Sequence, residues 1–280
     1  MKIEPVILDQ WYPVATEDAV QAGKVYSTQL LGQPIEYRLD ENGELFATDS
    51  ASGQPLQTLK KYYTCWVSLG KPGDIFELPE FAETDRRIVA AGSIRVHASG
   101  LRVVENFLDM AHFPFVHAGI LGEQPYTVVK PYQVDIENDE IFARDCGFYQ
   151  PKAALSNEGG LNIEYIYRVS SPFNAMLYKT CPMQPARMDV IGLFVQPCTE
   201  EWSIVHVPMA YLDDHASLKD LRLFQQTIFG QDITILSNHI PRKMPLLSSI
   251  ETSSRADSVS VAYRRWLHEK GVRYGTWQEV

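Results

Sequence analysis

The sequence lacks the features that mark membrane-spanning or secreted proteins. No apolar run approaches the roughly 18 residues of a transmembrane helix, and the first residues, Met1-Lys2-Ile3-Glu4-Pro5, do not resemble a signal peptide. Only four cysteines occur among 280 residues, and none are close enough to form a C-x-x-C pair. Scattered cysteines in a chain of this length indicate reduced, mostly buried thiols, so we expect a cytoplasmic protein without a disulfide framework.

An excess of positive charge is also missing. The chain has 25 Lys and Arg against 35 Asp and Glu, a formal net charge of -10. Phosphates would repel such a chain, so nucleic acid and anionic membranes are poor partners. The composition, with 45% hydrophobic and 21% charged residues, is ordinary for a globular protein. We therefore expect a small-molecule substrate or a protein partner.

Two kinds of periodicity divide the chain. Residues 24–48 read as a small antiparallel meander, residues 62–69 as a strand, and residues 126–211 as several long antiparallel strands. Apolar residues at helical spacing predict three helices, at residues 101–112, 216–239 and about 255–270. Strands followed by a long helix predict an α+β fold, with helices packed on one face of a curved antiparallel sheet above a cavity.

The segment from Asp109 to His117 carries the clearest chemical signal. His112 and His117 stand five residues apart, behind an aspartate three residues earlier. On a straight helix the two histidines would point about 140° apart, because each residue turns about 100°. Pro114 lies between them and interrupts helical geometry, so we expect the chain to bend there and bring both rings to one metal. The alternative is a pair of ordinary structural histidines.

Two histidines and one carboxylate on one face, with open positions, are typical of non-haem Fe(II) oxygenases. Asp232 is the favoured third ligand, because a carboxylate in the apolar company of residues 224–233 should be paired or metal-bound. A solvated helix face is the alternative for this residue. Other acidic candidates near the last two helices are Asp213, Asp214, Asp220 and Asp257. His206, in a predicted strand, is a candidate to face the cavity and touch substrate.

Residues 105–117, which read ENFLDMAHFPFVH, resemble the iron-site signature of the large subunits of Rieske non-haem iron oxygenases. Less specific similarity is found at residues 11–15, 30–34, 66–70 and 262–267. The resemblance implies that His112, His117 and Asp232 hold one mononuclear Fe(II). It also implies that Asn106 lies beside the iron. Asp109 would bond a histidine ligand and receive the incoming electrons.

The resemblance also implies an architecture. Residues 76–280 would form a catalytic domain with the helix-grip fold, also called START/Bet v1-like, built on a curved antiparallel sheet. Residues 1–75 would form a small β-rich remnant of a Rieske domain. Family membership further implies a ring-like trimer, either of identical or of mixed subunits.

One departure from the family pattern is large. Relatives bind a [2Fe–2S] cluster through C-x-H and C-x2-H motifs, and neither motif occurs anywhere in this sequence. The resemblance is therefore to oxygenase components that lack their own cluster and take electrons, ultimately from NADH, through a reductase partner that carries a Rieske domain. An additional oxygenase subunit is a further expected partner.

The expected activity is an O2- and Fe(II)-dependent monooxygenase reaction on a small heteroaromatic substrate. The nearest branch of the family implies N7-demethylation of 7-methylxanthine, although ring hydroxylation stays open. The rival hypothesis is a catalytically silent helix-grip subunit that binds a ligand or scaffolds an oxygenase complex. A zinc hydrolase is a third reading, but the H-E-x-x-H motif of such enzymes is absent.

Overall fold

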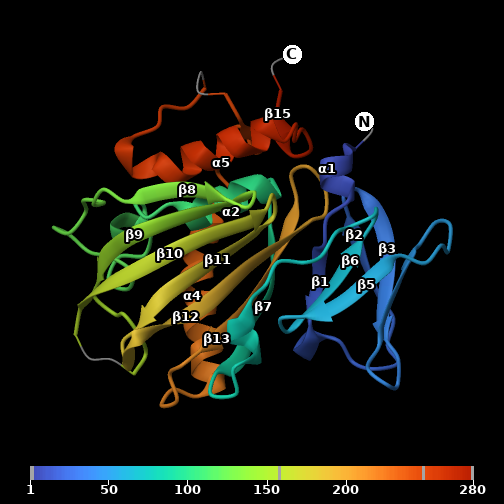
Figure 1. The fold of residues 1–280 in the computed structure, drawn as a ribbon, viewed down its shortest axis with the longest axis horizontal. Helices are drawn as coiled ribbons and strands as arrows, with labels where there is room; N and C mark the ends of the chain where they lie inside the picture. Colours follow the sequence, from blue (N-terminus) through green and yellow to red (C-terminus); the bar gives the residue numbers. More distant parts are fainter. Residues whose placement is uncertain (1–2, 157–158, 248–249, 279–280) are drawn as a thin grey trace.

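Six short strands form two small antiparallel sheets at one end of the molecule (Figure 1). The structure is a computed structural model that describes residues 3–156, 159–247 and 250–278. One sheet has the order β1-β6-β5, with β1 at Tyr12–Thr16, β5 at Gln57–Lys61 and β6 at Thr64–Ser68. The other has the order β2-β3-β4, with β2 at Tyr26–Leu30, β3 at Gln33–Leu39 and β4 at Leu45–Asp49. This second sheet confirms the predicted meander.

A seven-stranded antiparallel sheet makes up the larger part of the fold (Figure 1). Its order is β7-β13-β12-β11-β10-β9-β8. The strands are β7 at Arg87–Val96, β8 at Gln133–Glu137, β9 at Glu140–Gln150, β10 at Leu161–Ser171, β11 at Asn174–Cys181, β12 at Gln184–Pro197 and β13 at Ser203–Tyr211. Along β9 buried residues alternate with more exposed ones, which is the pattern of a strand with one face on the core.

The helices lie against one face of this sheet, as the α+β prediction requires (Figure 1). The helices of this layer are α2 at Gly100–Leu108, α3 at Phe113–Val116, α4 at Leu218–Leu236 and α5 at Ser258–Glu269, while the short helix α1 at Pro5–Leu8 lies at the end of the molecule with the small sheets. Short 3-10 turns occur at Glu17–Ala19, Pro79–Ala82 and Arg255–Asp257, and β14 at Met244–Pro245 pairs with β15 at Thr276–Trp277. Across the described ranges, we find no helix long and apolar enough to span a bilayer.

The opposite face of the large sheet packs against the small sheets. Trp66 of β6 is fully buried, and its ring centroid lies 4.8 Å from that of Phe194 on β12. Gln196, also on β12, donates hydrogen bonds of 2.8 Å to Thr28 and to the backbone oxygen of Gln29. Aromatic burial and paired polar groups therefore fix the small sheets to the large one.

Strands β5 and β7 and the short pair β14 and β15 were not predicted, and one helix is shorter than expected. β5 and β7 have no clear alternation of apolar and polar residues in the sequence. The predicted helix at 101–112 ends at Leu108, because Asp109 leaves helical geometry with φ -83° and ψ 122°. The predicted helices at 216–239 and 255–270 are confirmed as α4 and α5, and α5 is followed by Gly271 with a positive φ of 72°.

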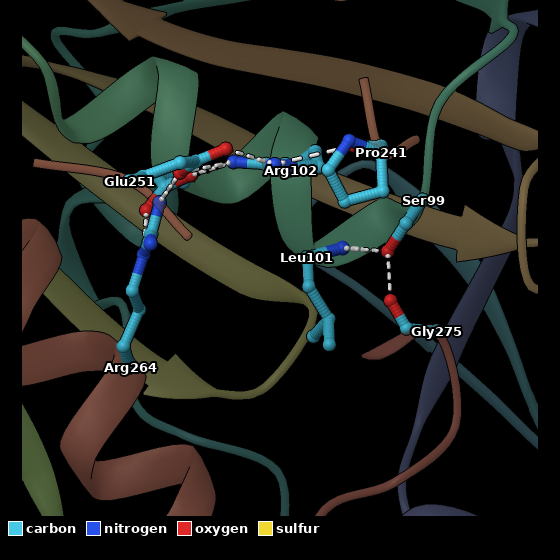
Figure 2. A network of polar contacts seen from close by, with 8 residues as sticks. Ser99, Leu101, Arg102, Pro241, Glu251, Arg264 and Gly275 are labelled. Carbon is cyan, nitrogen blue, oxygen red and sulfur yellow. Dashed lines mark hydrogen bonds and ion pairs between the residues drawn. The ribbon is translucent and has the colours of Figure 1, made fainter. Parts of the chain in front are cut away.

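Polar contacts hold the N-terminal turn of α2 (Figure 2). Ser99 caps the helix by accepting from the Leu101 amide at 3.2 Å, and its hydroxyl donates to the Gly275 backbone oxygen at 2.8 Å. One turn on, the Arg102 guanidinium, 2% exposed, donates to both carboxylate oxygens of Glu251, at 3.0 and 2.5 Å. These contacts join the N-terminal turn of α2 to the C-terminal part of the chain.

The same network contains a second arginine. Arg264 of α5 donates to Glu105 and to Glu251, each at 2.5 Å, and Arg102 also donates to Glu105 at 3.0 Å. Burial raises the pKa of Glu251, but its bonds to Arg102 and Arg264 outweigh this and lower the pKa to about 2. Two arginines and two glutamates thus form a neutral cluster that fastens α5 to α2.

Arg102→Met should lower the free energy of unfolding by about 2–3 kcal/mol. The substitution keeps an unbranched apolar stem but removes the guanidinium, which leaves three charges with a net charge of -1. Breaking a buried ion pair costs about 3–5 kcal/mol before the partial exposure of Glu251 is considered. Urea unfolding measures the effect. Arg265→Met on the exposed face of α5, where the arginine side chain is 67% exposed, is the matched control and should change stability by less than about 0.5 kcal/mol. Equal stabilities of the two variants would contradict the role of the network.

Candidate metal centre

The two histidines lie at the ends of one short helical turn. His112 is the N-cap of α3 and His117 its C-cap. The Asp109 carboxylate accepts from the Ala111 amide at 2.7 Å, which closes the turn that separates α2 from α3. The prediction that Pro114 bends the chain between the histidines was wrong, because Pro114 lies in the first turn of α3, where proline is well tolerated. The break comes three residues before His112.

His112, His117 and Asp232 converge on one point. The Nε2 atoms of the two histidines lie 3.0 Å apart. The Asp232 Oδ1 atom lies 3.4 Å from His112 Nε2 and 3.2 Å from His117 Nε2. All three ligand atoms fall within 4.8 Å of one another, and all three residues are largely buried. α4 supplies Asp232 from a position more than a hundred residues further along the chain.

These residues fit one divalent transition-metal ion. Ligand atoms about 2.1 Å from one ion, at angles of about 90–110°, lie about 3.0–3.4 Å apart, and the observed separations are 3.0, 3.2 and 3.4 Å. The donor set, two imidazole nitrogens and one carboxylate oxygen, places three acceptors around one point, which calls for a cation. Such a facial arrangement is typical of non-haem iron.

The outer ring nitrogen of each histidine is held by a neighbour. His112 Nδ1 lies 3.1 Å from Asp109 Oδ2, and His117 Nδ1 lies 2.8 Å from Gln231 Oε1. Both partners are acceptors, so each Nδ1 carries a proton, and with a metal bound each Nε2 would present its lone pair to the centre. Gln231 was not foreseen. Only its position next to Asp232 indicated a role. Because adjacent residues on a helix point about 100° apart, Gln231 is not expected to face the same site as Asp232.

Electrostatic interactions within the cluster change the pKa values of its side chains. Burial raises the pKa of Asp232, but the bonds to His112 and His117 outweigh this effect and lower the pKa to about 2. Asn106 also donates a hydrogen bond of 3.0 Å to the same carboxylate. Burial lowers the pKa of His112, whereas Asp109 and Asp232 raise it to about 9. Two carboxylates around one imidazole therefore favour positive charge at this point.

The cluster opens into a cavity between the large sheet and α2, α3 and α4. The cavity has a volume of about 70 Å3. Most of its lining is apolar, from residues Val103, Phe107, Leu177, Ile191, Leu193, Val207, Phe224, Ile228 and Phe229 among others. A small, mostly apolar ligand next to a metal is the occupant that this lining favours.

His206 does not line this cavity. Its neighbour Val207 does, and adjacent strand residues point to opposite faces. The His206 ring lies between Ser93 Oγ at 2.9 Å and Gln196 Oε1 at 3.2 Å, and burial lowers its pKa to about 3. The candidate role of His206 in substrate contact is therefore corrected: it is a neutral histidine in the layer between the sheets.

The other acidic candidates have local structural partners. Asp213 accepts from Ser156 and from two backbone amides. Asp220 lies in the first turn of α4 and bonds Ser217, while Asp257 completes a capping box with Ser254. Asp214 is mostly exposed, beside His215. Among the described residues, Asp232 is the only predicted carboxylate that lies with the two histidines.

Comparison with known proteins shows which family the chain belongs to. A family model described as the C-terminal domain of vanillate O-demethylase oxygenase matches residues 96–273, and the chain belongs to that family. The prediction of a Rieske-type oxygenase component, an oxidoreductase, is confirmed. Non-haem iron is the cofactor that the family implies.

Several known proteins are similar to the chain. It is 50% identical to the probable methylxanthine N7-demethylase NdmC of Pseudomonas sp. (strain TJI-51), over 96% of both chains. Identity to the methylxanthine N1-demethylase NdmA of Pseudomonas putida is 23%, over 75% of this chain and 59% of that one.

Solved structures with low identity share the fold. The structure of NdmA from Pseudomonas putida CBB5 with caffeine superposes with a TM-score of 0.79, at 17% identity over 94% of this chain and 91% of that one. Apo dicamba monooxygenase superposes with a TM-score of 0.69, at 12% identity over 94% and 96%. The predicted helix-grip architecture is thereby confirmed.

Proposed function

We propose that the protein is the oxygenase component of an N-demethylase that removes the N7 methyl group of 7-methylxanthine. The observation that carries the proposal is the cluster of His112, His117 and Asp232 at the wall of a small apolar cavity. The 50% identity to a probable methylxanthine N7-demethylase supports the choice of substrate class. In the overall reaction, O2, two electrons and two protons convert the N–CH3 group to N–H, with formaldehyde and water as the other products.

The side chains of the centre have separate tasks in this proposal. His112, His117 and Asp232 would hold Fe(II), which supplies the activation of O2 when bound. Asp109 and Gln231 fix the tautomer and the orientation of the two imidazoles. Asn106 donates to Asp232 and so holds the carboxylate toward the histidines. The apolar walls exclude water and keep the substrate methyl group close to the centre.

Asp109 is the part of the centre that reaches the surface. Its side chain is 30% exposed, against 11% for His112 and 10% for Asp232. It opens on a polar groove on the outer side of α2, where Asn106, His239 and Glu251 also lie. We assign electron delivery to this path, from a partner that carries a Rieske cluster reduced through NADH.

The remaining assignments are supported by the sequence and the family. Residues 1–75 would be a cluster-free remnant of a Rieske domain, which matches the two small sheets that precede β7. The protein would act as a trimer, alone or with a further oxygenase subunit. Four free, buried cysteines support a cytoplasmic location. The apolar cavity beside a converging ligand set favours catalysis over a silent scaffolding role.

The test is turnover with defined components. With the partner, NADH, O2 and 7-methylxanthine, formaldehyde and xanthine should form in equal amounts. Without a Rieske-containing partner, the rate should fall to background. A ring-hydroxylated product without formaldehyde would contradict N-demethylation, and sustained turnover without the partner would contradict the assigned electron source.

A further inference from the structure

Apart from the metal cluster, one wall of the cavity carries buried polar side chains. Gln150, at the end of β9, and Tyr165, on β10, are each 1% exposed, and both line the cavity. Burial raises the pKa of Tyr165, and the adjoining Gln150 side chain lowers it in part. Even so, Gln150 Oε1 and the Tyr165 hydroxyl lack an aligned hydrogen-bond partner among the described residues. A buried polar atom without a partner is unfavourable, so a cavity-facing pair of them indicates a ligand that supplies the missing bonds.

Lys179 extends this wall. It is the direct cross-strand partner of Tyr165 between β10 and β11, so the two side chains share one face of the sheet. Lys179 is 8% exposed, and its Nζ donates to the Ala153 backbone oxygen at 2.5 Å. An ammonium group has three donors, and within the described residues no second acceptor contacts this one. Burial lowers the pKa of Lys179 to about 8, although Asp189 opposes the shift, so most of the side chain is protonated at neutral pH.

Together the three groups offer donors and an acceptor side by side. Lys179 donates, Gln150 Oε1 accepts, and the Tyr165 hydroxyl can do either. We propose that Gln150, Tyr165 and Lys179 form a subsite that recognises an unmethylated lactam edge of the substrate, a ring carbonyl beside a ring N–H. This rests on the proposed function, because the six-membered ring of a 7-methylxanthine presents that edge opposite its N-methylated five-membered ring.

The subsite would act by selecting against extra methyl groups. A methyl group on the lactam nitrogen removes the N–H that Gln150 needs and introduces carbon between polar protein atoms. A site built to bond an N–H discriminates strongly against an analogue that lacks it, because its buried polar groups are then left unpaired. The subsite would also turn the N7 methyl group toward the metal end of the cavity.

Calorimetric binding to the purified full chain tests the proposal without turnover. The probes are 7-methylxanthine, theobromine, which adds a methyl group at N3, and caffeine, which adds methyl groups at N1 and N3. We expect the Kd to rise about 10–100-fold from 7-methylxanthine to caffeine. Equal affinity for all three would overturn the proposal.

Two variants test whether Tyr165 and Lys179 produce the selectivity for 7-methylxanthine over caffeine. Tyr165→Phe and Lys179→Met should each weaken binding of 7-methylxanthine about tenfold or more, and binding of caffeine less than about threefold. Tyr165→Phe removes only a hydroxyl that lacks an aligned hydrogen-bond partner among the described residues, so it guards against a folding defect in Lys179→Met. Lys219→Met, an exposed position at the start of α4, is the matched control and should bind like the wild type. Unchanged affinities in both variants, or equal losses for both ligands, would overturn the subsite.

The two proposals fail in different ways. If 7-methylxanthine binds with the expected pattern but yields no formaldehyde, the subsite stands and the proposed reaction fails. If vanillate, an aromatic carboxylate, binds through Lys179 while 7-methylxanthine does not bind, the subsite is an anion site and the lactam proposal is overturned.

Discussion

His117→Ala is expected to weaken iron binding more than about 100-fold. Even groups that only orient a metal ligand contribute about 10–100-fold to metal affinity, and His117 supplies one of three converging ligand atoms. It is also nearly fully buried, with 1% of its side chain exposed, so solvent or a neighbouring side chain does not readily replace it. Metal analysis of anaerobically reconstituted protein measures the change, and His112→Ala and Asp232→Ala should behave in the same way.

Exposed residues of the same types provide the controls. His215→Ala and Asp214→Ala remove side chains that are 64% and 78% exposed, and both variants should keep close to one iron per chain. Retention of iron in Asp232→Ala would show that another carboxylate completes the site. Loss of iron in the control variants would show that the metal is bound at the surface.

Asp109→Asn should abolish turnover driven by NADH while leaving iron in place. The carboxylate bonds two donors, the Ala111 amide through Oδ1 and His112 Nδ1 through Oδ2. Asparagine keeps the shape but offers one acceptor oxygen and no charge. We expect turnover with the partner to fall about 100-fold or more, and iron affinity to fall at most about 10–100-fold, so that saturating iron restores full occupancy.

Single turnover with added hydrogen peroxide separates the two roles of Asp109. This reagent supplies oxygen and electrons together and bypasses the partner. If Asp109 receives electrons, the variant with full iron should still convert bound substrate with peroxide at close to the wild-type yield. Loss of both the NADH-driven and the peroxide-driven reactions at full iron content would assign Asp109 to the metal site alone.

The sequence predicted which residues are the metal ligands better than it predicted the backbone that positions them. The spacing of His112 and His117 and the apolar surroundings of Asp232 were visible in the chain, and the structure brings these three residues together. The way in which they meet was not visible, because the end of α2 depends on the turn made by Asp109. Proline at 114 indicated a bend, but proline is equally compatible with the first turn of a helix.

The polar wall of the cavity could not be predicted, because it depends on strand register. Tyr165 and Lys179 are 14 residues apart and become neighbours only through the pairing of β10 with β11. A shift of one residue would turn either side chain to the opposite face. The same argument explains the error at His206, since an alternating strand does not reveal which of its two faces meets the cavity.

Anomalous diffraction at the iron edge, from crystals of the protein reconstituted with Fe(II), tests the central claim most directly. The account predicts one strong peak within about 2.0–2.2 Å of His112 Nε2, His117 Nε2 and an Asp232 carboxylate oxygen. A peak at any other group of residues, or full substrate turnover by protein that shows no peak at these three side chains, would contradict it.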